Sequence, residues 1–502
     1  MGVQQDFGGF DPSFLGVTIR FGSDRSWQIY ENAVESAEPL PIPAGNSSEE
    51  TFETISITSV LSHEVRHFHD FFLTSYSAYL FRLRIQLLLN ILELLPRLTE
   101  SDGHYNCVPI PISKWCVLSA VERTRQLSRL PGRADGKPWV AVDLPYLDKK
   151  ALEPAPGPKI VEDSMEAVQN LIAAAIRGQS RIRDLTYNPQ TVSDTASFQP
   201  WQIFELSGLL VQMQEIWHYY GVPETESFTN YLISSKTPYG AILRVAWHMW
   251  GKTQRPLDSG LTSAMVTWSL LGSYERDAWK ACPTERFVRL WTHVAKHGMP
   301  QAGARFTSLF EEWSRATELS TIDEGLSDAL RTFRRAHDAV RDFAKVKGSF
   351  SAESFGPFLL RVLDGVVKTS EHMIAAFRQN PDRYVYPHLY IEHISSFANP
   401  SVRLLADGGF IRFNSPKKGR EKDHIVEWAV EQGSDNLIAS MIVPSSLSEH
   451  VFLEAHDVHR LSAMIALTDF LFADKARARA DIQRTGRVWF SQSDLKPIEM
   501  FW

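Results

Sequence analysis

The sequence predicts a mostly α-helical protein with a small β element near the N-terminus. Helical spacing of apolar residues dominates the 502-residue chain, whereas alternation with a period of two is clearest before residue 30. With 44% hydrophobic and 22% charged residues, the composition is that of an ordinary globular protein with a large buried core.

The β element is expected to be a hairpin. Apolar and polar side chains alternate from Val17 to Phe21 and again from Trp27 to Ile29. Gly22–Asp24 lies between these two stretches and has the composition of a turn. Two antiparallel strands joined by this turn are therefore predicted.

A long helical run is expected from Glu49 to Leu95, where Pro96 ends it. Apolar residues recur along it at spacings of three and four. We expect an interruption near Thr74–Ser75, because serine and threonine hydroxyls there can bond the backbone and compete with the helix.

Helical patterns also dominate the remainder of the chain. Further helices are predicted at Val161–Arg177, Pro200–Tyr220, Ala241–Met249, Leu261–Lys280, Ala304–Val346, Phe358–Arg378 and Leu453–Ala480, with a hairpin-like stretch at Gly408–Arg420. Changes in composition predict four regions: 1–130, a Pro/Gly-rich connection at 131–160, a helical region at 161–347 and an α+β region at 348–502.

The net charge of −7 argues against nucleic acid or an anionic membrane as a partner, since both require a basic surface. Basic clusters at Arg331–Arg341, Lys417–Lys422 and Lys475–Arg487 contain acidic residues or adjoin them, and are expected to be solvated faces. The three cysteines cannot form a disulfide framework, the first residues lack the pattern of a secretory leader, and Leu87–Leu95 is too short to span a membrane. A cytoplasmic location is therefore expected.

The chemistry-bearing motif is His63-Glu64-Val65-Arg66-His67, an HExxH pattern within the predicted long helix. Residues four apart lie one above the other on a helix, so His63 and His67 can present two imidazoles to one metal ion. Glu64 would then lie beside the open coordination position, where its carboxylate can take a proton from metal-bound water.

These residues resemble the zincin metallopeptidases, and the resemblance is limited to the motif helix. It implies one Zn²⁺ held by His63 and His67, Glu64 as the general base, and a nearby sheet edge that holds an extended peptide. The positions where metzincins carry a glycine and a third histidine are Asp70 and Leu73 here. A gluzincin-like arrangement, in which a glutamate from a later helix completes the site, fits better.

Glu205 is the candidate third ligand. It lies in the strongly apolar helix predicted at Pro200–Tyr220, and a carboxylate buried there requires a compensating partner, which a metal would supply. Gly208 follows about one turn later and would let a neighbouring helix approach closely. The alternative is a surface glutamate that borders the apolar stripe.

Two further polar residues lie on the motif helix. Asp70 is a candidate to orient an imidazole from outside the ligand set; the alternative is a solvated carboxylate or an ion pair with Arg66. His69 points away from the side of His63 and His67 and is expected at the surface or facing a partner.

The function expected from these features is a zinc-dependent endopeptidase in which Glu64 activates zinc-bound water. The large helical remainder predicts a restricted protein or peptide substrate and leaves room for a regulatory partner protein. Two alternatives stay open: a non-catalytic helical interaction scaffold, and a ferritin-like di-iron oxidase that would use the pairs Glu64/His67 and Glu215/His218.

Overall fold

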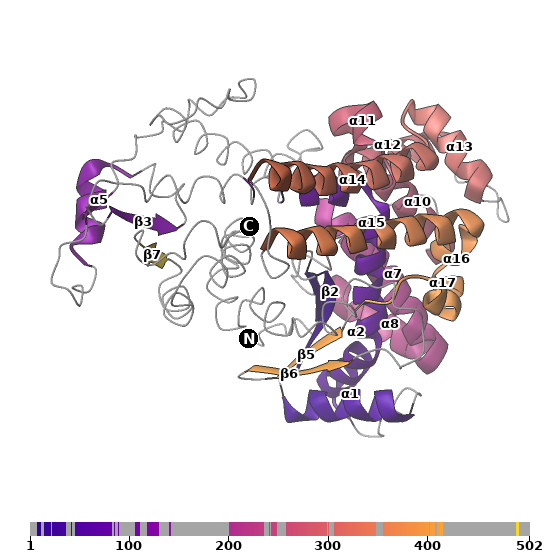
Figure 1. Ribbon diagram of the computed structural model, residues 1–502. Helices are drawn as coiled ribbons and strands as arrows, with labels where there is room; N and C mark the ends of the chain where they lie inside the picture. Colours follow the sequence, from indigo (N-terminus) through magenta and orange to yellow (C-terminus); the bar gives the residue numbers. More distant parts are fainter. Residues whose placement is uncertain are drawn as a thin grey trace. The chain divides into compact units, whose positions relative to one another are not determined.

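The chain divides into two compact units in the computed structural model (Figure 1), which describes residues 8–11, 15–21, 23–36, 42, 46–82, 85, 89, 106–110, 118–129, 140–141, 200–234, 240, 242–247, 258–298, 300, 306–347, 355–400, 402–406, 409–414 and 488–490. The first unit takes residues 1–80, 185–334 and 365–431, and the second takes 81–184, 335–364 and 432–502. The predicted boundaries near 131–160 and 348 stay a prediction.

The predicted fold class, mostly α with a small N-terminal β element, is confirmed. The β element of the first unit is a four-stranded sheet. Its strands are β1 (Gly8–Asp11), β2 (Gly16–Phe21), β5 (Val402–Ala406) and β6 (Gly409–Asn414), in the order β1-β2-β5-β6. β2 runs parallel to β5, and the two outer pairs are antiparallel.

The predicted hairpin from Val17 to Ile29 is wrong in its second half. β2 pairs with the preceding strand β1, and the residues after it form helix α1 (Asp24–Ser36). Ser23 and Ser26 cap this helix by reciprocal hydrogen bonds between their backbone amides and hydroxyls, both 3.1 Å long. Trp27 and Tyr30, one helical turn apart, then both pack on Phe21, with ring centroids at 4.9 and 5.3 Å.

Helix α2 (Ser48–Leu73) carries the HExxH motif. Ser47 and Glu50 form a capping box at its start, in which each side chain accepts a hydrogen bond from the other's backbone amide. The helix ends at Thr74, whose extended backbone separates it from a second helical segment at 75–82. The Thr74 hydroxyl accepts a hydrogen bond of 3.4 Å from the Ser77 backbone amide, so the predicted interruption is confirmed together with its cause, a hydroxyl bonded to the backbone.

Helix α7 (Pro200–Tyr220) has the predicted bounds, and Gly221, with φ of +88°, leads into α8 (Val222–Ser234). The helices that follow in this part of the chain are a segment at 242–247, α10 (Ser259–Leu270), α11 (Tyr274–Asp277), a 3₁₀ turn (Ala278–Ala281), α12 (Pro283–His297) and α13 (Phe306–Thr317). They are followed by α14 (Ile322–Lys347), α15 (Phe355–Gln379), α16 (Asp382–Val385), α17 (Pro387–His393) and a 3₁₀ turn (Ile394–Ser396).

Two predicted helices are interrupted. The stretch Leu261–Lys280 breaks after Leu270, and the Ser273 hydroxyl caps the new helix α11 by accepting from the Arg276 amide. The stretch Ala304–Val346 breaks at Glu318, which has a left-handed φ of +57°, before Thr321 caps α14. Of the hairpin predicted at Gly408–Arg420, the structure describes one strand, β6, whose antiparallel partner β5 precedes that stretch; residues 408 and 415–420 lie outside the described residues.

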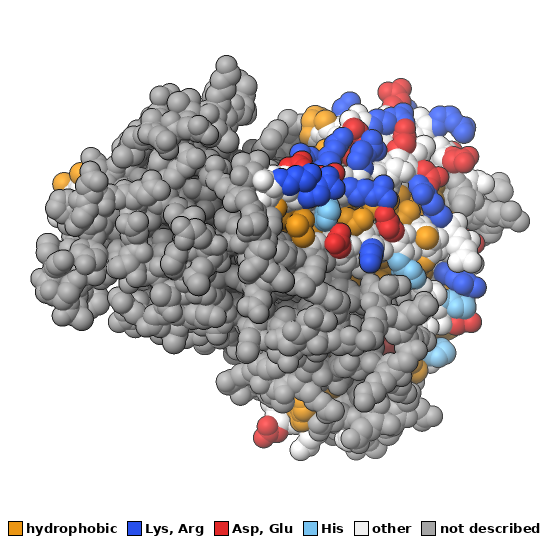
Figure 2. Space-filling model, in the orientation of Figure 1, with side chains coloured by type: hydrophobic (Ala, Val, Ile, Leu, Met, Phe, Trp, Pro, Cys, Tyr) orange, Lys and Arg blue, Asp and Glu red, His pale blue; other side chains and the backbone are white. Residues whose placement is uncertain are grey.

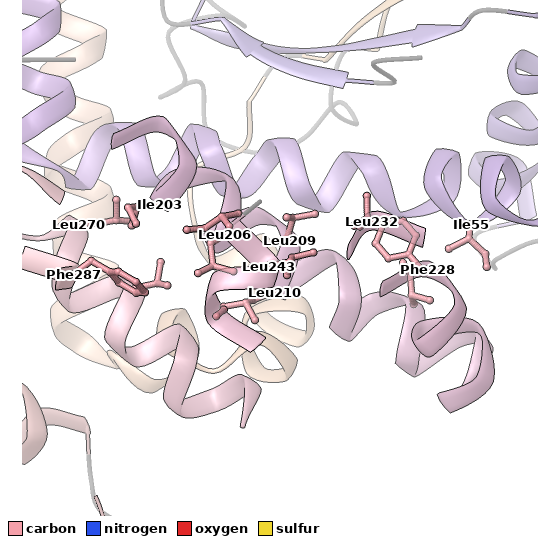
Figure 3. Close-up of a cluster of buried hydrophobic side chains, with 14 residues drawn as sticks. Ile55, Ile203, Leu206, Leu209, Leu210, Phe228, Leu232, Leu243, Leu270 and Phe287 are labelled. Atoms are coloured by element: carbon pink, nitrogen blue, oxygen red, sulfur yellow. The ribbon is translucent and has the colours of Figure 1, made fainter. Parts of the chain in front are cut away.

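A core of aliphatic and aromatic side chains holds α7 in place. Figure 3 shows Leu206, Leu209 and Leu210 of α7 within this cluster, together with residues of the neighbouring helices. Its buried members are Ile55, Ile203, Leu206, Leu209, Leu210, Ile216, Phe228, Leu232, Ile242, Leu243, Ala246, Val266, Leu270 and Phe287. Since α7 buries apolar residues on several sides, its position is firmly fixed.

The second unit contains a three-stranded sheet with the order β4-β3-β7, formed by β3 (Asn106–Ile110), β4 (Val140–Ala141) and β7 (Val488–Phe490), and helix α5 (Ala120–Leu127). α14 and α15 each contribute residues to both units. The helices predicted at Val161–Arg177 and Leu453–Ala480 lie outside the described residues, as do the basic clusters at Lys417–Lys422 and Lys475–Arg487 and all of 131–160 except β4.

The basic cluster on α14 is accompanied by acidic partners. Figure 2 shows Lys and Arg side chains gathered on one face with Asp and Glu among them. Arg331 pairs with Glu275 at 2.5 Å and Arg334 with Glu371 at 2.6 Å. None of the helices in the described ranges combines the length and apolar character that crossing a membrane would require.

Candidate metal centre

Helices α2 and α7 pack against each other in opposite directions, because residues 58, 62 and 63 of α2 contact residues 220, 215 and 205 of α7. Polar side chains join them along the contact. Early residues of α2 meet late residues of α7 in the hydrogen bonds Thr58–Tyr220 (3.1 Å), Ser59–Gln212 (3.0 Å) and Ser62–Glu215. Further along α2, His63 and His67 contact Glu205, which lies near the start of α7.

Three side chains converge at that end and could hold a metal ion: His63 and His67 from α2 and Glu205 from α7. The two imidazole Nε2 atoms are 3.0 Å apart. His63 Nε2 is 3.3 Å from Glu205 Oε2, and His67 Nε2 is 3.5 Å from Glu205 Oε1. The side chains of His63, His67 and Glu205 are only 8%, 10% and 19% exposed.

These distances fit a small divalent cation. Zinc–ligand bonds of about 2.0–2.1 Å at tetrahedral angles place neighbouring ligand atoms about 3.3 Å apart. The two imidazole nitrogens, 3.0 Å apart, lie close to that separation, and each of them has one oxygen of the Glu205 carboxylate at 3.3 or 3.5 Å. With one ligand atom from each residue, the three atoms lie within 4.8 Å of one another. Two imidazole nitrogens and one carboxylate are also a donor set that zinc accepts. The residues present therefore fit the ion that the motif implies.

The electrostatics of the three groups favour a cation. Burial by itself would raise the pKa of Glu205, but the charge of His67 and hydrogen bonds from both imidazoles hold it well below the usual range. Burial likewise lowers the pKa of His67, and the Glu205 carboxylate outweighs this effect and raises it. Glu205 is thus an ionised carboxylate whose negative charge favours a positive charge beside it.

Gly208 makes the close approach of α7 possible. A Cβ atom at this position would lie 2.9 Å from both Cε1 and Nε2 of His63. Any side chain there would displace the imidazole, so the His63 ring lies directly against the α7 backbone. The position of Gly208, about one turn after Glu205, predicted this close approach.

Strand β1 lies directly over Glu64. A Cβ atom on Gly8 would be 2.8 Å from both Cγ and Oε1 of Glu64 and 2.7 Å from Cγ2 of Val60. Glu64 itself is 6% exposed and is not among the three converging ligand residues. Because Gly8 has no side chain, the Glu64 carboxylate fits beneath the strand. This contact between β1 and α2 was not predicted from the sequence.

If Glu64 is the general base that the motif predicts, Gly8→Ala should lower turnover by about 100-fold, because a Cβ atom there would displace the Glu64 carboxylate and a shift near 1 Å of a reacting group costs that much. Zinc content should stay unchanged, since Gly8 contacts Glu64 and none of the three converging residues. Gly9→Ala is the matched control, because a Cβ atom there has no neighbour within 4 Å. Equal activity of the two variants would contradict the prediction.

Comparison with known proteins adds no relative. No family model, no curated protein and no solved structure matches this chain. The chemistry of the site therefore rests on its own residues.

Asp70 does not contact the imidazoles by any hydrogen bond found among the described residues. Its Oδ1 atom is 3.5 Å from Arg66 Nε and accepts a hydrogen bond of 2.6 Å from the Tyr384 hydroxyl. The ion pair with Arg66, which was the alternative to an imidazole-orienting role, is therefore present. The charge of Asp70 still contributes to raising the pKa of His67, after the larger effects of burial and Glu205.

The expectation that His69 is a surface residue is wrong, although it does point away from the ligand histidines. Its side chain is fully buried, with Nδ1 2.7 Å from the Tyr390 hydroxyl and Nε2 2.6 Å from the Ala398 carbonyl oxygen. A carbonyl oxygen can only accept, so His69 Nε2 carries a proton and donates to Ala398. The expectation assumed a solvent-facing side of α2, whereas most of this helix is buried all round.

The residues of the di-iron alternative do not form one cluster. Glu215 points into the α2–α7 contact, where it accepts a hydrogen bond from Ser62, whereas His218 is exposed. Within the described part of the chain, the one group of three or more metal-binding side chains is His63, His67 and Glu205. The second ExxH pair therefore does not converge on Glu64 and His67.

Proposed function

We propose that the protein is a zinc-dependent endopeptidase of gluzincin type that hydrolyses a restricted protein substrate. The observation that carries the proposal is the convergence of His63, His67 and Glu205. Glu64 is the next residue after His63 on α2 and lies outside this group. A zinc ion bound there supplies a Lewis acid that polarises the scissile carbonyl and makes water nucleophilic at neutral pH. The remaining chemistry is assigned to the chain itself.

Glu64 is the proton carrier in this proposal. It follows His63 directly on α2 and is not among the three converging residues, so its carboxylate is not needed as a ligand. It would accept a proton from the attacking water and deliver it to the leaving amine. Gly8 supports this role, because any side chain at position 8 would occupy the space that the Glu64 carboxylate takes.

Strand β1 offers the place where a peptide would bind. It is the edge strand of its sheet, paired on one side with β2, and no described strand pairs with its other side. An extended peptide can add to such an edge through backbone hydrogen bonds, which would hold its scissile bond near Glu64. The low exposure of the three ligand side chains supports a restricted substrate specificity, because only a peptide that fits the site could reach them.

Metal analysis of the purified full-length chain tests the site. We expect one zinc per wild-type chain, its loss in His63→Ala and in Glu205→Ala, and its retention in His218→Ala, which replaces an exposed histidine. Iron in place of zinc, or stoichiometric zinc in the His63 variant, would overturn the metal assignment.

Peptide hydrolysis tests the activity. The zinc-loaded chain is incubated with a library of peptides of known sequence, and new termini are identified by mass spectrometry. Cleavage should stop when the zinc is removed by a chelator and return when zinc is added back. A zinc-loaded chain that cleaves no peptide and no unfolded protein would overturn the endopeptidase proposal while leaving the metal site intact.

A further inference from the structure

Arg66, between the two ligand histidines in sequence, is one of the largest fully buried side chains of the described residues. Its guanidinium forms hydrogen bonds with three elements besides its own helix. It donates to Ser207 Oγ of α7 at 2.9 Å, to the Tyr384 carbonyl oxygen of α16 at 2.7 Å, and to Thr267 Oγ1 of α10 at 3.4 Å. It also pairs with Asp70 on α2 itself.

Aromatic rings complete the surroundings of this cation. The guanidinium carbon lies 3.7 Å from the ring centroid of Tyr384 and 4.8 Å from that of Tyr390. A buried charge is tolerated only while its donors stay paired, so each contact resists displacement of the group. The planar fork of donors also fixes the directions in which the partners must lie. Arg66 is therefore a rigid connection between α2 and its neighbours.

The contact with α7 falls at the part of that helix that forms the site. Ser207 follows Glu205 by two residues and immediately precedes Gly208, which lies against the His63 ring. The bond from Arg66 thus holds the turn of α7 that contains both the third ligand and the close approach to the first. The bond to Thr267, in contrast, leads to α10, which supplies none of the three ligand side chains.

We propose that Arg66 is a positioning residue for the ligand set: through Ser207 it fixes α7 against α2 so that Glu205 meets His63 and His67. This inference rests on the metal site of the proposed function and does not depend on peptide hydrolysis. Arg66 would thus hold the Glu205 carboxylate of α7 in place, in addition to stabilising the fold.

Two small substitutions separate positioning from general stability. Ser207→Ala and Thr267→Val each remove one hydrogen bond to the same guanidinium, the first toward α7 and the second toward α10. Zinc affinity of the full-length variants is measured by competition with a chromophoric chelator, and thermal unfolding is followed on the zinc-free chains. We expect a similar small fall in the unfolding midpoint for both variants, and zinc affinity about tenfold lower or more for Ser207→Ala alone.

Cobalt(II) substitution supplies a second measurement. Its visible absorption reports how completely the coordination is formed, so Ser207→Ala should alter the spectrum and Thr267→Val should leave it as in the wild type. Wild-type zinc affinity in Ser207→Ala, or an equal loss in both variants, would overturn the positioning role. A wild-type chain that binds no zinc would overturn the metal site and this inference with it, whereas zinc binding without hydrolysis would affect the proposed activity alone.

Discussion

The Glu64→Gln chain should keep its zinc and lose about 100- to 10,000-fold in turnover, the usual contribution of a general base. Glutamine has nearly the shape of glutamate, so it fits the space under Gly8, where the Glu64 Oε1 atom lies 2.8 Å from a Cβ built on the glycine. It cannot accept a proton from water. Because Glu64 is not one of the converging ligand residues, the affinity for zinc should stay as in the wild type.

The measurement compares the cleavage rate per zinc-loaded chain for a peptide found in the library screen, together with zinc content. Glu49→Gln is the matched control, because it replaces an exposed glutamate in the first turn of the same helix. Full activity in Glu64→Gln would remove the general base from the proposal. Loss of zinc in that variant would instead show that Glu64 takes part in metal binding.

Glu215→Gln should stabilise the zinc-free chain at alkaline pH. Burial raises the pKa of Glu215 from 4.5 to about 7, against the opposing effect of the hydrogen bond from Ser62. A carboxyl whose pKa is raised on folding contributes stability below its unfolded pKa, and this contribution is lost as the pH rises through about 7. Glutamine stays neutral and does not incur this loss.

A shift of this size corresponds to about 3 kcal/mol at full burial, and we expect about 2 kcal/mol because Glu215 keeps some contact with solvent. Urea unfolding of both chains between pH 5 and pH 8, with a chelator present, gives the difference in unfolding free energy at each pH. The variant should be the more stable chain at pH 8, and the two should converge near pH 5. Glu226→Gln, at an exposed position of α8, should show no such divergence; a constant difference for Glu215→Gln across the range would contradict the prediction.

The sequence predicted α7 with its correct bounds because the signal there is long and local. A proline at the first helical position begins a run of apolar residues that continues to Tyr220. The pairing of His63 with His67 follows in the same way from helical spacing. Glu205 could be chosen because a carboxylate in so apolar a helix requires a partner, and the structure brings it to the two imidazoles.

The features that the sequence analysis missed depend on short caps or on distant contacts. Ser23 and Ser26 cap α1 and favour a helix there, whereas the apolar alternation that predicted a strand spans only Trp27–Ile29. Arg66 donates hydrogen bonds to Ser207 and Tyr384, which lie 141 and 318 residues later in the chain. No local sequence pattern could therefore predict these contacts. Gly8 carried a usable signal, since paired glycines entering a strand often mark a close backbone contact.

The ligands come from helices far apart in the chain: His63 and Glu205 are separated by 142 residues. The three side chains His63, His67 and Glu205 come together only after α7 has packed on α2. In the unfolded chain, a metal ion would find at most the two histidines of the motif close together. Zinc therefore selects the native state and should add about 1.4 kcal/mol to its stability for each tenfold excess over the dissociation constant. If the proposed zinc site is correct, zinc starvation would lower the stability of the folded protein as well as its proposed activity.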